Sequence, residues 1–301
     1  MQTEMKTERA NAKINLYLNV VGRRENGYHD IVSIMQTVSL CDLVTVRYHA
    51  GAHFSVHLSA SGNDAMPTDC RNLAWRAAEL YLGAIGQSGE VSISIEKHIP
   101  MAAGLAGGSA DAAAVLRALN TLCNHRLSVS ELCALGAKLG ADIPFCIVGG
   151  GALVEGIGER LTEIASMPTC PMVVACMGDG VSTPWGYGKL DELHSNFADV
   201  TDTSDPRAAR IADVMQNGSV FDAYGDFYNI FEEVVPDVQP HVNRIKRLMT
   251  DCGALRAMMS GSGPSVFGVF QTAEDAVNAC ERLQKMGASA FVCHPRPKYR
   301  D

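Results

Sequence analysis

Pro100-Met-Ala-Ala-Gly-Leu-Ala-Gly-Gly-Ser-Ala-Asp111 is the stretch of this 301-residue chain that says most about its fold. Its residues are nearly all small, which lets a backbone come close to a ligand. A strand pattern of period two precedes it at residues 91–96, and an alanine-rich segment of high helix propensity follows it. We therefore expect a loop that opens a helix, whose free N–H groups and partial positive charge suit a phosphate. Ser109 is expected to cap that helix or to contact a phosphate or metal ion, and a flexible capped connection is the alternative.

Strand and helix patterns are mixed in the rest of the chain. Strands are expected at residues 12–20, 31–38, 42–48, 53–59, 151–155, 170–176, 255–259, 264–270 and 289–293. Helices are expected at residues 72–85, 129–139 and 236–250 and after the capping-box pattern Thr272–Asp275, with a loop at 178–188 and a mobile polar segment at 194–208. This mixture indicates an α/β or α+β fold, and the restart of the pattern after Pro168 predicts a domain boundary near there.

The composition excludes several classes of protein. Hydrophobic residues make up 47% and charged residues 19% of the chain, as in ordinary folded domains, and the net charge is −8. An acidic chain is a poor nonspecific binder of nucleic acids or membranes, so we expect neither as a partner. The ten cysteines include no CxxC pair, which indicates reduced thiols rather than a zinc site. We expect a cytoplasmic protein, because the N-terminus is polar and no run of 18 apolar residues occurs.

Three segments together resemble the motifs of the GHMP kinases. Residues 100–109 resemble the phosphate loop of that family, which has proline, three residues, Gly-Leu, small residues and serine. Asn11-Ala-Lys-Ile-Asn-Leu16 resembles the opening strand, and Ser260-Gly-Ser-Gly-Pro-Ser265 resembles the third, glycine-rich motif. Each segment alone is a weak signal, but all three occur in the expected order, and the resemblance extends from about residue 11 to about residue 295.

The phosphate loop departs from the family pattern at three alanines. Ala102 and Ala106 stand where glycine is usual, and Ala110 stands where a second serine is usual. A methyl group is tolerated if the backbone is right-handed, and it is costly if either of the first two positions requires a positive φ.

Two further segments narrow the resemblance to one subgroup. Gly27-Tyr-His-Asp30 and Gly140-Ala-Asp-Ile-Pro-Phe145 are similar to segments of the GHMP kinases that phosphorylate a cytidine diphosphate-linked methylerythritol in non-mevalonate isoprenoid precursor biosynthesis. The resemblance implies an α+β fold of two domains. Residues 1–165 would form the ATP-binding domain, similar to the second domain of ribosomal protein S5, and residues 166–301 a ferredoxin-like domain, with the active site in the cleft between them.

The implied reaction transfers the γ-phosphate of ATP, with Mg2+, to the 2-hydroxyl of the methylerythritol unit. The implied partner is this small molecule, and the chain would be a monomer or a weak homodimer. Two alternatives stay open. One is another GHMP kinase, such as a homoserine kinase, and the other is a catalytically inactive homologue that binds a nucleotide.

The resemblance also implies a catalytic pair. Asp142 is the expected base, which orients the acceptor hydroxyl and takes its proton. Lys13 is the expected cation, which keeps Asp142 ionised and stabilises the transferred charge, so both side chains should converge on one acceptor oxygen. Without the resemblance, Asp142 would be interpreted as a turn or capping residue, and Lys13 as an outward-facing strand lysine.

The remaining predicted site residues divide between the two ligands. The predicted ATP site comprises Asn72, Lys97, Pro100, Ala102, Ala103, Gly104, Leu105, Ala106, Gly107, Gly108 and Ser109. The predicted acceptor site comprises Asn15, Tyr28, His29, Thr183, Tyr187, Gly261 and Ser262, with Tyr28 and His29 as a cytidine-binding pair. Tyr187 is expected to stack on the other side of the cytosine base, and Trp185 is the alternative residue for that position. A helix N-cap is the alternative for Asn72, and a solvated lysine for Lys97.

Overall fold

The computed structural model describes residues 4–62, 65–194, 197, 205–217 and 220–299. The chain divides into two compact units. The first unit comprises Met1–Ala12, Cys41–Ile99 and Ala106–Val148, and the second comprises Lys13–Leu40, Pro100–Leu105 and Gly149–Asp301. The division near residue 165 stays a prediction. Of the polar segment 194–208, residues 195–196 and 198–204 lie outside the described residues.

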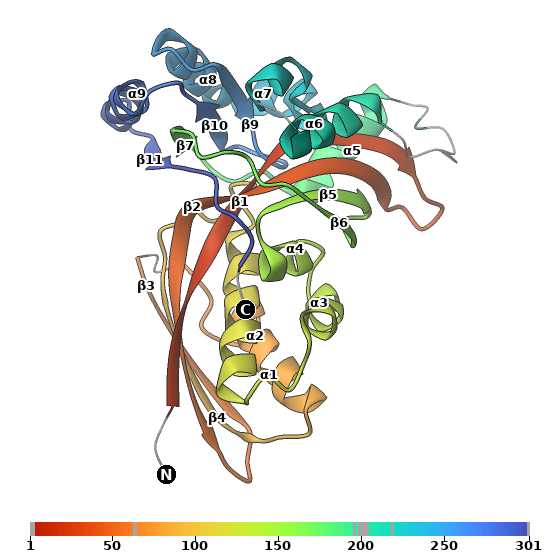
Figure 1. Cartoon of the computed structure of the whole chain (residues 1–301), viewed down its shortest axis with the longest axis vertical. Coiled ribbons are helices and arrows are strands. Elements are labelled where there is room, and N and C mark those ends of the chain that lie inside the picture. The colour runs from red at the N-terminus through yellow and green to blue at the C-terminus, as the bar shows by residue number, and fades with distance from the viewer. Residues whose placement is uncertain (1–3, 63–64, 195–196, 198–204, 218–219, 300–301) are drawn as a thin grey trace. The chain divides into compact units, whose positions relative to one another are not determined.

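The first unit combines a sheet with four helices (Figure 1). Its strands are parts of β1 (Glu4–Arg23) and β2 (His29–Ala50), with β3 (Ser55–Ser61) and β4 (Gly89–Glu96); β4 pairs antiparallel with β2 and parallel with β3. Its helices are α1 (Leu73–Ala84), α2 (Gly107–Leu122), α3 (Val129–Ala137) and α4 (Ile143–Val148). The alanine-rich α2 packs against α1, α3 and α4, because small side chains allow close helix contacts.

The second unit contains the other parts of β1 and β2 and a separate four-stranded sheet. β5 (Gly151–Gly156) pairs antiparallel with β2 and with β6 (Arg160–Ile164), and β8 (Tyr228–Asn229) pairs parallel with β1. The separate sheet has the order β11 (Ser289–Cys293), β7 (Met172–Cys176), β10 (Val266–Val269) and β9 (Arg256–Met259), with every neighbouring pair antiparallel. The helices are α5 (Thr183–Leu193), α6 (Pro206–Asn217), α7 (Val235–Val238), α8 (His241–Asp251) and α9 (Ala273–Lys285), with two 3-10 helices, η1 (Val220–Asp226) and η2 (Ile230–Glu233).

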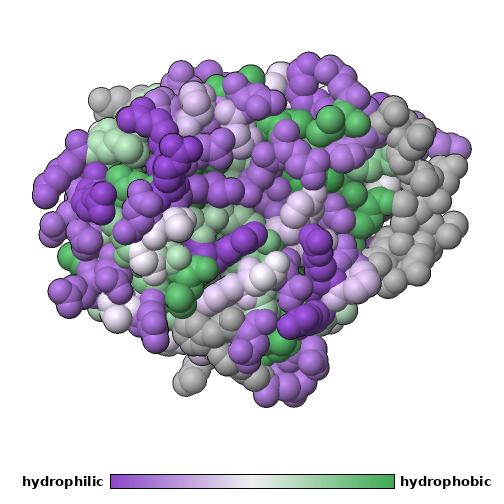
Figure 2. All heavy atoms as spheres, turned by 90° about the horizontal axis from the view of Figure 1, so that it is seen from above, coloured by the Kyte–Doolittle hydropathy of each residue, from purple (hydrophilic) through white to green (hydrophobic). Residues whose placement is uncertain are grey.

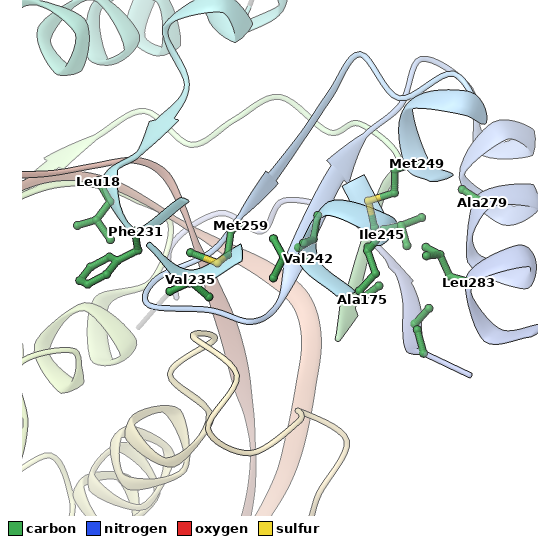
Figure 3. Close-up of a cluster of buried hydrophobic side chains, with 14 of the residues drawn as sticks. Leu18, Ala175, Phe231, Val235, Val242, Ile245, Met249, Met259, Ala279 and Leu283 are labelled. Carbon is green, nitrogen blue, oxygen red and sulfur yellow. The ribbon is translucent and has the colours of Figure 1, made fainter. Parts of the chain in front are cut away.

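The core of the second unit forms where α8 and α9 bury one face each (Figure 3). Val242, Ile245 and Met249 of α8 are buried, as the helical spacing predicts. Val238, predicted on the same face, is exposed, because the predicted helix is interrupted between α7 and α8 at Gln239 and Pro240. Proline lacks the N–H group that would continue a helix.

Several other elements differ from the sequence-based expectation. β2 is one strand where two were expected, because no glycine or proline separates residues 31–38 from 42–48. Helix α5 occupies part of the expected loop at 178–188, with a proline in its first turn, where proline is tolerated. The short helix α4 and strand β6 were not expected.

The helix caps follow the sequence closely. Asn72 caps α1, Ser128 caps α3 in a complete capping box, and Thr272 caps α9 by accepting a hydrogen bond from Asp275 N–H.

The face shown in Figure 2 is mostly hydrophilic, with hydrophobic residues scattered among the polar ones. In the described part of the chain, no helix combines the length and apolar character needed to span a bilayer.

Candidate active site

The small-residue loop has an alternating backbone. Ala102, Gly104 and Ala106 all have positive φ, at 51°, 77° and 56°, whereas the residues between them do not. Alternation of this kind turns successive N–H groups toward one side and forms an anion-binding concavity. The two alanines therefore occupy the left-handed region in which glycine, usual there in the resembling family, has no steric cost.

The loop opens directly into α2. The first intrahelical hydrogen bond runs from Ala110 N–H to the Ala106 carbonyl at 2.9 Å, so the N–H groups of Gly107, Gly108 and Ser109 precede the helical ladder. Ala106 holds the N-cap position and offers no side-chain cap. The expectation that Ser109 caps the helix is therefore wrong, because Ser109 already lies in the first turn. A contact between Ser109 and a phosphate stays a prediction.

The beginning of the loop packs against the glycine-rich turn at 260–263. Ser260 Oγ donates to the Gly104 carbonyl at 3.0 Å, and Ser265 N–H donates to the Ala103 carbonyl at 3.2 Å. A Cβ atom on Gly104 would lie 2.2 Å from the Ser260 carbonyl oxygen, so only glycine fits there. Two motifs distant in sequence thus form one backbone assembly within the second unit.

Lys13 and Asn15 join that assembly from β1. Lys13 N–H donates to the Leu105 carbonyl at 3.1 Å, and Lys13 Nζ donates to Asn15 Oδ1 at 2.7 Å. Gly261 N–H donates to the same oxygen at 3.0 Å, and Asn15 Nδ2 donates to Ser33 Oγ at 2.8 Å. Both Lys13 and Asn15 are buried, so the interpretation of Lys13 as an outward-facing strand lysine is wrong.

Two further polar residues, Asn229 and Thr183, form hydrogen bonds with the same turn. Asn229 Nδ2 donates to the carbonyls of Met259 and Gly261 at 2.8 and 2.9 Å. Thr183 and Ser262 share a hydrogen bond of 2.9 Å between their hydroxyls. The structure thus brings together five of the residues predicted from sequence, which are Lys13, Asn15, Thr183, Gly261 and Ser262.

His29 and Tyr187 form a second group in this unit. Their rings stack with centroids 4.6 Å apart and planes 13° apart. His29 Nε2 and Asp191 Oδ1 share a hydrogen bond of 2.7 Å, and Arg23 lies 3.3 Å from the other Asp191 oxygen. Tyr28 is largely exposed. An exposed aromatic ring can receive a flat ligand such as a base.

Asn72 and Lys97 are both engaged in the first unit. Asn72 Oδ1 accepts from Ala74 N–H at 2.9 Å and its Nδ2 donates to the Pro67 carbonyl at 2.8 Å, so it acts as an N-cap. Lys97 is buried in ion pairs with Asp42 and Asp111, so the interpretation as a solvated lysine is wrong. The contact of either residue with a nucleotide stays a prediction.

Asp142 lies immediately before α4 in the first unit. Its carbonyl accepts a hydrogen bond from Cys146 N–H at 3.0 Å, which gives it the position of an N-cap. Its side chain is partly exposed, so it can be reached by a ligand. Lys13 belongs to the second unit, and the convergence of the two side chains on one acceptor oxygen stays a prediction.

Comparison with known proteins matches the chain to two family models. The model of the GHMP kinases N terminal domain matches residues 72–150, and that of the GHMP kinases C terminal domain matches residues 200–289. Enzymes named 4-diphosphocytidyl-2-C-methyl-D-erythritol kinase are similar over nearly their whole length. The one from Alkaliphilus metalliredigens is 40% identical over 91% of both chains, and the one from Caldicellulosiruptor saccharolyticus is 41% identical over 92% of both. The chain belongs to this family of GHMP kinases.

Solved structures agree with this family. A crystal structure of 4-(cytidine 5'-diphospho)-2C-methyl-D-erythritol kinase is 34% identical, covers 96% of this chain and 99% of its own, and has a TM-score of 0.78. Mevalonate kinase from L. major has a TM-score of 0.74 at 16% identity, which indicates a shared fold alone. The predicted α+β fold of a GHMP kinase is confirmed, and so is the prediction of a kinase that acts on a hydroxyl group.

Sequence reasoning missed several residues that hold these groups in place. Asp42 and Asp111 had a usable signal, because a lone carboxylate inside an apolar strand or an alanine-rich helix needs a buried cation. Asp191 and Asn229 had none, since each lies in a polar or mixed segment where its residue type is ordinary.

Proposed function

We propose that the chain transfers the γ-phosphoryl group of ATP to the 2-hydroxyl of 4-diphosphocytidyl-2-C-methyl-D-erythritol and yields the 2-phosphate and ADP. This step belongs to the synthesis of isoprenoid precursors without mevalonate. The observation that carries the proposal is the alternating backbone from Ala102 to Ala106, which leads into the free N–H groups of α2. The family supports the choice of acceptor, because its named members carry that substrate in their names.

The phosphates of ATP would bind at the loop from Pro100 to Ser109. Backbone N–H groups at Gly107 and Gly108 would donate to phosphate oxygens, and neither residue has a side chain to obstruct them. Asn72 would lie near the rest of the nucleotide, and Lys97, whose side chain is buried against Asp42 and Asp111, would lie beside the start of α2. The protein carries a net charge of −8, so a local cradle of N–H groups is what this anionic ligand requires.

Mg2+ would accompany ATP and offset negative charge that develops on the phosphates. Among the residues that the structure describes, no three His, Cys, Asp or Glu side chains are grouped as metal ligands. Because Mg2+ keeps several waters and often binds through substrate phosphates, such a group is not required. Ser109 lies in the first turn of α2, and its hydroxyl is the proposed protein ligand of Mg2+.

Asp142 and Lys13 would assist the transfer of the phosphoryl group in two ways. Asp142 would accept the proton of the acceptor hydroxyl, and Lys13 would stabilise negative charge on the group in transfer. Lys13 is buried and its amine is oriented by Asn15, so its position is already set before the substrate binds.

The cytosine of the acceptor would bind at Tyr28 and His29. Tyr187 stacks on His29 and holds its ring, which makes Tyr187 rather than Trp185 the proposed aromatic neighbour of the base. Thr183 and Ser262, which already share a hydrogen bond, would contact the methylerythritol or diphosphate portion together with Asn15 and Gly261.

Purified protein with ATP and Mg2+ tests the proposal by direct comparison of acceptors. We expect turnover of 4-diphosphocytidyl-2-C-methyl-D-erythritol and formation of one ADP per acceptor, with homoserine and mevalonate inert. Turnover of homoserine instead would support another GHMP kinase. Nucleotide binding without turnover of any acceptor would support an inactive homologue.

We also propose that the kinase acts in the cytoplasm, as a monomer or weak homodimer, on a small molecule and without nucleic acid. Residues 1–165 and 166–301 would be its two domains. Sedimentation at several protein concentrations tests the oligomeric state, since a weak dimer would dissociate on dilution.

A further inference from the structure

Three charged side chains meet in the interior of the first unit, beside the start of α2. The Lys97 side chain is 4% exposed, and its partners Asp42 and Asp111 are 0% and 2% exposed. Lys97 Nζ donates to Asp111 Oδ2 at 2.8 Å and to Asp42 Oδ2 in a shorter contact. Taking each of these ions out of water costs several kcal/mol, so such a group often adds little net stability. Its geometry is therefore the better guide to its role.

Asp42 holds the chain that enters the phosphate loop. Its Oδ1 accepts hydrogen bonds from His98 N–H at 2.6 Å and from Ile99 N–H at 2.9 Å, while its Oδ2 accepts from Lys97 Nζ. One buried carboxylate thus fixes three consecutive residues. The next residue, Pro100, begins the loop, so its starting direction is set by Asp42.

Lys97 and Asp111 hold the chain that leaves the loop. Asp111 lies four residues after Gly107, which places both on the same face of α2. A Cβ atom on Gly107 would lie 3.4 Å from Lys97 Nζ and 3.1 Å from Ile99 Cγ2. The first residue of α2 therefore rests on the same amine that Asp42 and Asp111 bind, and on the last residue before the loop.

The charges of these three side chains also affect how an anionic ligand binds near the start of α2. Two carboxylates face one amine, and Asp111 Oδ1 has no hydrogen-bond partner among the described residues. The pKa of the Asp111 carboxyl is raised to about 7, first by burial and further by Asp42, although Lys97 opposes the shift. Without Lys97, the buried carboxylate of Asp42 would have no cation beside the helix start that we propose as a phosphate site, and it would repel the phosphate.

We propose that Asp42, Lys97 and Asp111 are positioning residues of the nucleotide site. They hold Ile99 and Gly107, the two ends of the loop, so that the N–H groups between them point at the phosphates, and they act through the loop rather than by contact with the nucleotide. This inference rests on the proposed function, because it requires a nucleotide bound at that loop. It gives Lys97 a different role from the direct ATP contact that the sequence predicts.

The test compares ADP binding with stability in single variants. Asp111→Asn and Lys97→Met each remove one charge of the group, and Tyr81→Phe is the matched control. Tyr81 donates a buried hydrogen bond of 3.0 Å to Asn120, which lies about 20 Å along α2 from Gly107 at 1.5 Å per residue. The measurements are the dissociation constant of ADP by calorimetry, the KM of the acceptor, and the unfolding temperature by circular dichroism.

We expect ADP to bind roughly tenfold or more weakly to Asp111→Asn and Lys97→Met. A displaced loop would lose at least one N–H hydrogen bond to a phosphate, and a charge-assisted hydrogen bond is worth at least that factor. The KM of the acceptor should stay within about twofold of the wild-type value. Tyr81→Phe should lose stability and still bind ADP like the wild type. If both charge variants bind ADP like the wild type under conditions in which they are folded, the group only stabilises the fold and the proposal is wrong.

A triple variant separates position from stability. Asp42→Asn/Lys97→Met/Asp111→Leu replaces all three buried ions with neutral side chains and leaves no unpaired charge, which often restores stability. We expect its unfolding temperature to recover toward the wild-type value while ADP binding stays weak. Recovery of both would overturn the proposal, because packing alone would then suffice. A wild-type protein that binds neither ADP nor ATP would instead overturn the proposed function, and this inference with it.

Discussion

Gly261 and Asn15 are joined by a hydrogen bond of 3.0 Å from the glycine N–H to the Asn15 side-chain oxygen. The same oxygen accepts from Lys13 Nζ at 2.7 Å, so both of its lone pairs are engaged. Asn15 is almost fully buried. One amide therefore fixes the glycine-rich turn and the proposed catalytic lysine relative to each other, which suggests that Asn15 orients Lys13 in addition to any contact with the substrate.

Asn15→Ala should lower kcat by roughly tenfold or more, because a small displacement of a catalytic group has large effects on rate. It should also destabilise the fold by about 1–3 kcal/mol, since the amine and the Gly261 N–H lose a buried acceptor. Gln36→Ala is a matched control, because Gln36 is another buried side-chain amide of this unit. It donates hydrogen bonds to the carbonyls of Thr37 and Arg296 and accepts one from Met167 N–H. Steady-state kinetics and urea unfolding measure both effects. An Asn15→Ala enzyme as destabilised as Gln36→Ala, with kcat unaltered, would remove the positioning role.

Asp142→Asn should lower kcat by about 10²–10⁴-fold, the usual contribution of a general base. Asparagine is as good an N-cap as aspartate, so α4 and the overall stability should be preserved and the loss assigned to the carboxylate. Asp69→Asn is the control, because Asp69 is an exposed carboxylate that precedes α1 and pairs with Arg71. Rapid-quench measurement of phosphoryl transfer distinguishes chemistry from product release. Unchanged transfer in Asp142→Asn would mean that another group accepts the proton.

Local chemistry explains why much of the fold was predictable. The caps at Asn72 and Thr272 were found because a side chain next to a helix start decides its geometry within a few residues. Helix α5 was missed because Pro184 and Gly186 are usual in loops. A glycine occupies this helical position because of a tertiary contact: a Cβ atom there would lie 3.0 Å from the Phe231 ring.

Site residues that lie within a motif could be predicted from the sequence, but the contacts that join them to residues distant in sequence could not. The sequence indicated Lys13, Asn15 and Gly261 individually, but their shared hydrogen bonds depend on strand pairing and turn contacts across more than 200 residues. The left-handed backbone at Ala102 and Ala106 contradicts the intrinsic preference of alanine. Only the surrounding structure, such as the packing of Gly104 on Ser260, can impose it.

The titration of Asp111 gives a pH dependence of stability. Its pKa is raised to about 7 in the folded chain by burial and by Asp42, with Lys97 opposing, compared with about 4 in an unfolded chain. Between these values the folded state keeps a proton that the unfolded state releases. The stabilising contribution is thus complete below about pH 4 and is lost as the pH rises through about 7.

Asp111→Asn removes this titration, so its unfolding temperature should rise relative to that of the wild type between about pH 5 and pH 8. Calorimetric unfolding of both proteins across this range measures the difference. Asp69→Asn serves as the control, because Arg71 holds the pKa of Asp69 at about 2, well below the range tested. A constant difference between Asp111→Asn and the wild type would show that Asp111 does not titrate there.

Ala106→Gly should stabilise the protein, by about 1 kcal/mol, because Ala106 has φ 56° and ψ 30° and a left-handed alanine carries a steric cost that glycine does not. Ala110→Gly is the matched control. Ala110 lies four residues later inside α2, where glycine costs about 1 kcal/mol relative to alanine. The same substitution is thus expected to have opposite signs at two nearby alanines of one segment.

Urea unfolding of both variants measures these two free energies. ADP affinity of Ala106→Gly should stay within about twofold of the wild-type value, since the N–H groups of Gly107 and Gly108 keep their directions. Weaker ADP binding together with higher stability would mean that the methyl group restricts the loop to its binding geometry. Equal destabilisation by both substitutions would mean that Ala106 is not left-handed in solution, and the alternating cradle for phosphate would have to be abandoned.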